Sequence, residues 1–274
     1  MENTRTKTTR NSLILLLTAA IWGMAFVSQS KGMDYMHPFT FNGVRSLIGA
    51  ASILVYILIS RKIAGDKAAP LDWKLNVKAG LLCGIFLTIA STLQQFGIKY
   101  TSVGKAGFIT TLYIIFVPMF GIFLKKKVAP VVWAAAVMAA VGMYLLCMTE
   151  SLRLGAGDIM VFLCAIAFAI QIMTVDHYAA RIDGAVVSCI QFTVCGVVCC
   201  IGALIWGQPT FGQLQEGLGA LLYAGVLSCG VGYTLQIVGQ KGLNPTVAAL
   251  IMSLESVIAT ISGWIAYKIG FLTT

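Results

Sequence analysis

The chain has 274 residues, of which 58% are hydrophobic and only 11% are charged, and its mean hydropathy is +0.89. Because a water-soluble domain carries about a quarter charged residues, this composition excludes a soluble protein and also a disordered one. The formal net charge of +9 does not indicate a nucleic-acid partner, since the basic residues stand in short clusters between apolar segments, such as Arg61-Lys62. The composition therefore predicts an all-α polytopic membrane protein.

Apolar runs long enough to cross a bilayer as helices follow one another along the chain. Their continuity and their length of about 20 residues exclude the short alternating strands of a β-barrel. The first run is too long for the apolar part of a cleavable signal peptide. We expect nine spans, at 11–30, 38–60, 75–98, 103–124, 129–148, 157–178, 185–206, 216–239 and 245–268.

Lys and Arg predict the orientation, because loops rich in these residues stay on the cytoplasmic side. With the N-terminus inside, the inner segments hold most of the basic residues, including Arg61-Lys62 and Lys125-Lys126-Lys127, whereas Lys31, Lys99 and Arg153 lie outside. We therefore expect a cytoplasmic N-terminus. An odd number of spans then places the C-terminus outside.

An internal repeat divides the chain. The segment LQQFGIK at 93–99 recurs as LQIVGQK at 235–241, and the same offset of 142 residues continues to pair identical residues further along, among them Ala106 with Ala248 and Ile109 with Ile251. Span 3 thus corresponds to span 8, so each unit is five helices long. Because five is an odd number of spans, the second unit must be inserted upside down relative to the first. We expect a first repeat at 1–150 with spans 1–5 and a second at 151–274 with spans 6–9, in which the tenth helix is missing. Inverted repeats are typical of secondary transporters.

Three motifs carry a family resemblance that extends over nearly the whole chain: AAIWGMAF at 19–26, LQQFGIKYTSVGKAGFITTLYIIFVPMFG at 93–121 and NPTVAALIMSLESVIATISGW at 244–264. With these motifs the sequence resembles the EamA-type branch of the drug/metabolite transporter superfamily. The resemblance implies two inverted five-helix units in a bacterial plasma membrane, and transport of small organic solutes, often outward. The chain departs from the family pattern where Ser256 replaces a proline that commonly follows the glutamate of span 9.

Glu255 lies near the middle of the last span, where an ionised carboxylate costs about 2.5–3.5 kcal/mol. Desolvation favours the neutral form of a carboxyl group, which suits a residue that alternates between a proton and a cationic group of the substrate. We predict that Glu255 binds substrate and couples transport to protons. The alternative is a protonated or paired Glu255 that only ties helices together.

Three further polar residues inside spans are candidates for substrate binding. Arg45 lies about 10 Å into span 2, where it is suited to hold a substrate carboxylate or to pair with Glu255 when the site is empty; snorkelling to the headgroups is the alternative. Gln94 and Gln236 correspond in the repeat and are expected near opposite faces, as gate contacts or as interhelical hydrogen bonds.

Aromatic residues inside the spans, away from the interfacial belts, are also candidates. Trp22, Tyr113 and Tyr233 would form an aromatic wall beside Glu255 for a cationic or amphipathic solute, or would simply pack in the core. Pro118 removes a backbone hydrogen bond within span 4 and is predicted to kink it as a hinge.

No catalytic or phosphate-binding signature is present in the sequence, so we expect neither an enzyme nor an ATP-driven pump. The cysteines are interpreted as small buried hydrophobes, and no cofactor and no metal site are predicted. The main hypothesis is a secondary active transporter, an exporter of a small organic metabolite, amino acid or amphipathic cation working by alternating access with proton coupling. Its predicted partners are the solute, the lipid bilayer and protons, with a homodimer as one option. The alternative is a non-transporting membrane scaffold or a channel-like pore.

Overall fold

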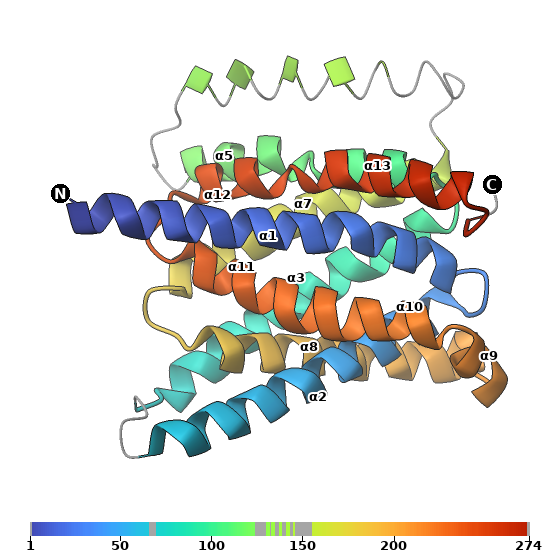
Figure 1. Cartoon of the computed structure of the whole chain (residues 1–274), viewed down its shortest axis with the longest axis horizontal. Coiled ribbons are helices and arrows are strands. Elements are labelled where there is room, and N and C mark those ends of the chain that lie inside the picture. The colour runs from blue at the N-terminus through green and yellow to red at the C-terminus, as the bar shows by residue number, and fades with distance from the viewer. Residues whose placement is uncertain are drawn as a thin grey trace.

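The computed structural model describes residues 2–65, 70–123 and 155–272, together with parts of 130–145. Within these residues every regular element is a helix (Figure 1). The boundary predicted between the two repeats, at 150/151, and the larger part of the fifth predicted span lie outside the described residues.

Ahead of the partly described stretch 130–145, the described residues of the first repeat form three long helices and a fourth that is broken in two. These elements are α1 (Glu2–Gly32), α2 (Pro38–Ala64), α3 (Trp73–Ile98), α4 (Val103–Thr110) and α5 (Tyr113–Phe123).

The second repeat follows the same order with more interruptions. Its elements are α7 (Ala156–Tyr178), α8 (Gly184–Gly202), the π-helical turn η2 (Ala203–Gly207), α9 (Phe211–Glu216), α10 (Leu218–Leu222), the π-helix η3 (Tyr223–Gly232), α11 (Tyr233–Gln240), α12 (Pro245–Met252) and α13 (Glu255–Lys268).

Eight stretches of the described residues are long and apolar enough to cross a membrane. They are Lys7–Gly32, Pro38–Ala64, Trp73–Ile98, Val103–Phe123, Ala156–Tyr178, Gly184–Gly207, Leu218–Gln240 and Pro245–Lys268. Each coincides, to within a few residues, with one of the nine spans predicted from the sequence. The predicted all-α polytopic fold is therefore confirmed.

Helix α7 runs opposite to α1, its counterpart in the repeat. The ring of His37, just after α1, lies 5.5 Å from that of Phe96 near the end of α3. Thr101, just after α3, donates a hydrogen bond to Asp158 in the first turn of α7. Helix α7 thus begins on the face where α1 ends, which we call the far face; the face where α1 begins is the N-terminal face. The chain termini lie at opposite ends of the bundle (Figure 1).

The offset of 142 residues also relates structural details of the two repeats. Helices α4 and α5 are separated by a turn at Thr111 and Leu112, and α12 and α13 by a turn at Ser253 and Leu254, which are the corresponding positions. Pro118 has Thr260 as its counterpart, so the break in both repeats does not depend on a proline. Both turns interrupt a span at the same level and leave short half-helices on either side.

Close contacts between glycines hold α3 against α7. A Cβ atom on Gly97 would lie 2.8 Å from the carbonyl oxygen of Gly157, and one on Gly157 would lie 2.8 Å from the carbonyl oxygen of Gly97. Because the obstructing atoms belong to the backbone, no rotamer change can relieve the clash.

Replacing Gly97 by alanine is therefore expected to push α3 away from α7 and to lower stability by about 1–3 kcal/mol. The loss is measured as a lower melting temperature of the detergent-purified protein. The matched control is Gly212→Ala, because a Cβ atom at Gly212 meets nothing within 4 Å. Equal melting temperatures for the two variants would contradict the prediction.

Candidate functional site

A small cavity lies at the centre of the bundle, between the two repeats. Its volume is about 30 Å³, which is room for one or two water molecules. The side chains around it come from all eight membrane-spanning stretches. All seven residues predicted to bind substrate line this cavity: Trp22, Arg45, Gln94, Tyr113, Tyr233, Gln236 and Glu255.

Glu255 begins α13 and is only 3% exposed. Its Oε1 accepts a hydrogen bond of 3.0 Å from the hydroxyl of Tyr113, the first residue of α5. Glu255 and Tyr113 are repeat counterparts, 142 positions apart. A direct contact between counterparts places both residues close to the pseudo-two-fold axis that relates the repeats, which is also where the two broken spans meet.

Arg45 enters the cavity from α2 and is 5% exposed. Its Nε donates a hydrogen bond of 2.9 Å to Oδ1 of Asn42, and its guanidinium carbon lies 5.5 Å from the centre of the Phe41 ring. Asn42 is held in turn by Ser91 of α3, at 3.0 Å. These contacts orient the guanidinium group, and the burial argues against snorkelling to the headgroups.

Arg45 and Glu255 line one cavity but do not pair with each other. Among the residues that the structure describes, the ion pairs are Lys31–Asp34 and Lys105–Asp158. The pairing between Arg45 and Glu255 that the sequence left open is thus not formed. The cavity presents a fixed guanidinium group and a carboxyl group as separate polar contacts.

An aromatic wall forms the side of the cavity nearest α1 and α11. The rings of Trp22 and Tyr233 lie 4.6 Å apart, and Phe192 meets Tyr233 edge-on at 4.9 Å. The indole Nε1 of Trp22 donates to the carbonyl of Ser228 in the π-helix η3, at 3.4 Å. Wider π-helical turns leave backbone carbonyls available for such contacts, which explains how the indole N–H of the half-buried Trp22 finds an acceptor.

Glutamines lie on both sides of the cavity. Towards the N-terminal face, Gln236 donates to Gln171 at 3.3 Å, and Gln171 donates to Gln191 at 3.4 Å. Towards the far face, Gln94 donates to Thr110 at 3.2 Å. Gln94 and Gln236 therefore make interhelical hydrogen bonds on opposite sides of the cavity, and their role as gate contacts stays a prediction.

Pro118 lies inside α5, two helical turns from the break at Thr111 and Leu112, and it is buried. It does not line the cavity, and its predicted role as a hinge stays a prediction.

Several lining residues were not among the seven, and a repeat signal was available for some of them. Ala25-Phe26 of α1 recur as Ala167-Phe168 of α7, again 142 positions later, and Gln29 corresponds to Gln171 in the same way. Phe26, Phe168, Gln29 and Gln171 all line the cavity. These residues could have been predicted from the sequence, because the same residue types recur 142 positions apart in the two repeats.

The two ends of the bundle differ in how they are closed. On the far face, the ring of Phe39 packs against Phe96 at 5.1 Å and Trp206 at 5.5 Å. On the N-terminal face, a pocket of about 580 Å³ opens between the end of α2, the start of α3, the α7–α8 loop and the end of α11. Arg61, Arg181 and Lys241 line this pocket.

His37 supports the packed far face. Its Nδ1 accepts a hydrogen bond from the backbone N–H of Phe39 at 3.3 Å and caps α2. Burial, together with the nearby Lys99 ammonium group, lowers the pKa of His37 below its usual value. The lowered pKa favours the neutral ring, which alone can accept this hydrogen bond.

The side chains that line the cavity are of the kinds that bind a solute. No cluster of three His, Cys, Asp or Glu side chains suited to a metal ion occurs among the described residues. The cavity offers a charged donor, a carboxyl group, amides and aromatic faces.

Comparison with known families identifies the class of protein. The model of the EamA-like transporter family matches the chain twice, at residues 10–148 and 155–273. The chain belongs to the EamA-like transporter family. The two consecutive matches agree with the two repeats, and the protein is a multi-pass membrane transporter.

Relatives of this EamA-like transporter carry names of the same kind. An uncharacterized transporter of Archaeoglobus fulgidus is 30% identical over 60% of this chain, and the match spans about half the length of that relative (48%). The uncharacterized transporter YwfM of Bacillus subtilis is 27% identical over 92% of this chain and 84% of its own.

A solved crystal structure has the same fold. It superimposes on this EamA-like transporter with a TM-score of 0.72, covers 97% of this chain and 90% of its own, and is 17% identical in sequence.

Proposed function

We propose that this EamA-like transporter is a secondary active exporter of a small zwitterion, such as an amino acid. One observation carries the proposal: a guanidinium and a carboxyl group line one cavity without pairing. In the proposed complex, Arg45 binds the solute's carboxylate and Glu255 binds its ammonium group. The rings of Trp22 and Tyr233 contact the remainder of the solute.

Transport proceeds by alternating access in this proposal. A cavity of about 30 Å³ is too small for an amino acid, so the solute enters only when helices move apart. The packed far face and the open pocket on the N-terminal face support a resting state closed on the far side. Equivalent motion of the second repeat would exchange the two ends. The collapsed cavity does not favour the channel-like pore.

Protons drive the export in this proposal, through Glu255. A carboxyl group that must leave water favours its neutral form, so it exchanges a proton against the ammonium group of the solute. We further propose that the protein lies in a bacterial plasma membrane with its N-terminal face towards the cytoplasm, since Arg61, Arg181 and Lys241 gather on that face.

A ligand-stability series tests the substrate class. The purified protein is heated with an amino acid, with its carboxamide, which lacks the carboxylate, and with the matching amine, for each type of side chain. A ligand at a hundred times its Kd stabilises by about 2.7 kcal/mol, so at least one amino acid is expected to raise the melting temperature while its amide and amine do not. Equal shifts by the amine and the amino acid would contradict the zwitterion assignment. Counterflow of the stabilising solute in liposomes then tests transport.

A further inference from the structure

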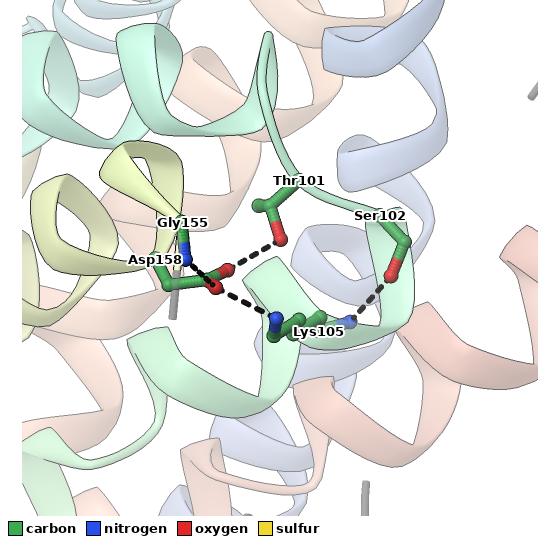
Figure 2. Close-up of polar contacts among 5 residues, drawn as sticks. All are labelled: Thr101, Ser102, Lys105, Gly155 and Asp158. Carbon is green, nitrogen blue, oxygen red and sulfur yellow. Dashed lines mark hydrogen bonds and ion pairs between the residues drawn. The ribbon is translucent and has the colours of Figure 1, made fainter. Parts of the chain in front are cut away.

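A buried ion pair outside the central cavity connects the two repeats (Figure 2). Nζ of Lys105, in α4, lies 2.6 Å from Oδ2 of Asp158, in the first turn of α7. The same carboxylate accepts hydrogen bonds from the Thr101 hydroxyl at 2.7 Å and from the Gly155 backbone N–H at 2.9 Å. The backbone N–H of Lys105 is bound by the Ser102 hydroxyl at 3.4 Å. The Asp158 carboxylate is thus held by three donors, and Ser102 fixes the start of the helix that carries Lys105.

This ion pair is costly to bury. Lys105 and Asp158 are only 7% and 3% exposed. Desolvation of two charges offsets much of their attraction, and a well-packed apolar pair often stabilises a fold equally well. Stability alone therefore does not account for charges at these positions. A buried pair does, however, strongly favour the one arrangement in which both partners are satisfied.

Among the described residues, the pair has no equivalent on the N-terminal face. It lies at the far face, where α3 ends and α7 begins. The counterparts of Lys105 and Asp158 on the N-terminal face are Val247 and Leu16, which are apolar and 44% and 42% exposed. The repeat is thus symmetric in its helices and asymmetric in this contact.

We propose that Lys105 and Asp158 form a latch that holds the far face closed and so makes the state accessible from the N-terminal face the resting state. This inference rests on the proposed alternating-access function. Opening of the far face would separate α4 from the start of α7 and would leave two charges without their partners. The aromatic packing of Phe39, Phe96 and Trp206 closes the same face. Solute binding in the central cavity would have to supply the free energy that opens the latch.

The latch is tested through the access of water-soluble reagent to the cavity. Cys229 lines the central cavity and is 2% exposed, so its labelling reports opening. The double variant Lys105→Gln with Asp158→Asn removes both charges and keeps side chains of similar size that can bond to each other. Labelling by a membrane-impermeant methanethiosulfonate is measured in membrane vesicles of both orientations. The Cys229→Ser variant supplies the background from the other cysteines.

We expect the neutral pair to raise the rate of Cys229 labelling from the far face by about tenfold and to lower it from the N-terminal face. The matched control is Lys31→Gln with Asp34→Asn, which removes an ion pair of the same far face that is partly exposed and lies within a single repeat. If Lys105→Gln with Asp158→Asn is labelled from the far face at the same rate as this control, the latch proposal is wrong.

A gentler variant keeps the test decisive if the double variant does not reach the membrane. Thr101→Val removes one hydrogen bond to Asp158 with little change in volume, and it is expected to raise far-face labelling several-fold. Lys105→Arg keeps the charge and should label as the wild type does. A purely structural contact would lower the melting temperature in Thr101→Val without changing the ratio of labelling from the two faces.

Labelling needs no substrate, so the latch and the proposed function can fail separately. A shift in labelling without solute counterflow would contradict the proposed zwitterion export and support the latch alone. Counterflow without any shift in labelling would contradict the latch and support the proposed export alone.

Discussion

Replacing Glu255 by glutamine is expected to abolish the acceleration of export by a pH gradient. Glutamine has nearly the same shape, and its side-chain oxygen can still accept the hydrogen bond from Tyr113. It can neither take up nor release a proton, and it does not carry a negative charge towards an ammonium group. Loss of a charged hydrogen bond corresponds to about 1.5–3 kcal/mol, so solute affinity should fall about tenfold to a hundredfold.

The measurement uses liposomes loaded with labelled solute, with and without an imposed pH gradient. The wild type should export faster with the gradient, whereas the Glu255→Gln variant should show only slow exchange that the gradient does not change. Tyr113→Phe removes the hydroxyl but keeps the carboxyl group, so it should retain gradient dependence. Glu216→Gln, on the exposed part of α9, controls for the substitution itself. A gradient-dependent Glu255→Gln variant would remove Glu255 from the coupling.

Replacing Arg45 by glutamine is expected to abolish the preference for a zwitterion over the amine that lacks the carboxylate. A bidentate guanidinium–carboxylate contact is among the strong hydrogen-bonded pairs, and its loss should weaken zwitterion binding about tenfold to a hundredfold. The amine never makes this contact, so its affinity should change little. The ratio of the two affinities therefore falls towards one.

Competition of amino acid and amine against labelled solute measures that ratio. Arg45→Lys should restore it only in part, because an ammonium group lacks the planar fork of guanidinium and the stacking on Phe41. Arg61→Gln, near the end of the same helix and lining the N-terminal pocket, is the matched control. Equal losses of affinity for zwitterion and amine in Arg45→Gln would indicate a damaged fold and would contradict a carboxylate contact.

Much of the architecture could be predicted because lipid imposes simple rules. A span must be apolar for about 20 residues, and it must satisfy its backbone groups internally. The spans were therefore visible in composition alone, and the broken spans at Thr111 and Ser253 fall at positions that the repeat already related. The seven candidate residues were selected because polar and aromatic side chains deep in spans are costly, and the same cost brings them to one interior cavity.

The sequence did not predict which side chains would touch. The sequence left two partners open for Arg45, a substrate carboxylate and Glu255. In the structure Arg45 contacts Asn42 and Phe41. Glu255 meets Tyr113, its repeat counterpart, because the pseudo-two-fold axis passes between the two broken spans. The ion pair between Lys105 and Asp158 was not predicted, because it depends on α4 and α7 meeting at the far face.

The sequence by itself determined the positions and order of most spans and the repeat that relates them. It also determined which polar and aromatic residues lie deep in the spans, where they are costly to place. These properties follow from transfer free energies, which depend on each residue and its depth in the bilayer. Only the tertiary structure decided that a carboxyl and a guanidinium group share one cavity without pairing, and that one face carries an ion pair while the other carries an open pocket. Such contacts depend on how helices far apart in the sequence cross. The two repeats share their helices but not these side chains, so the 142-residue repeat alone could not reveal the difference between the faces.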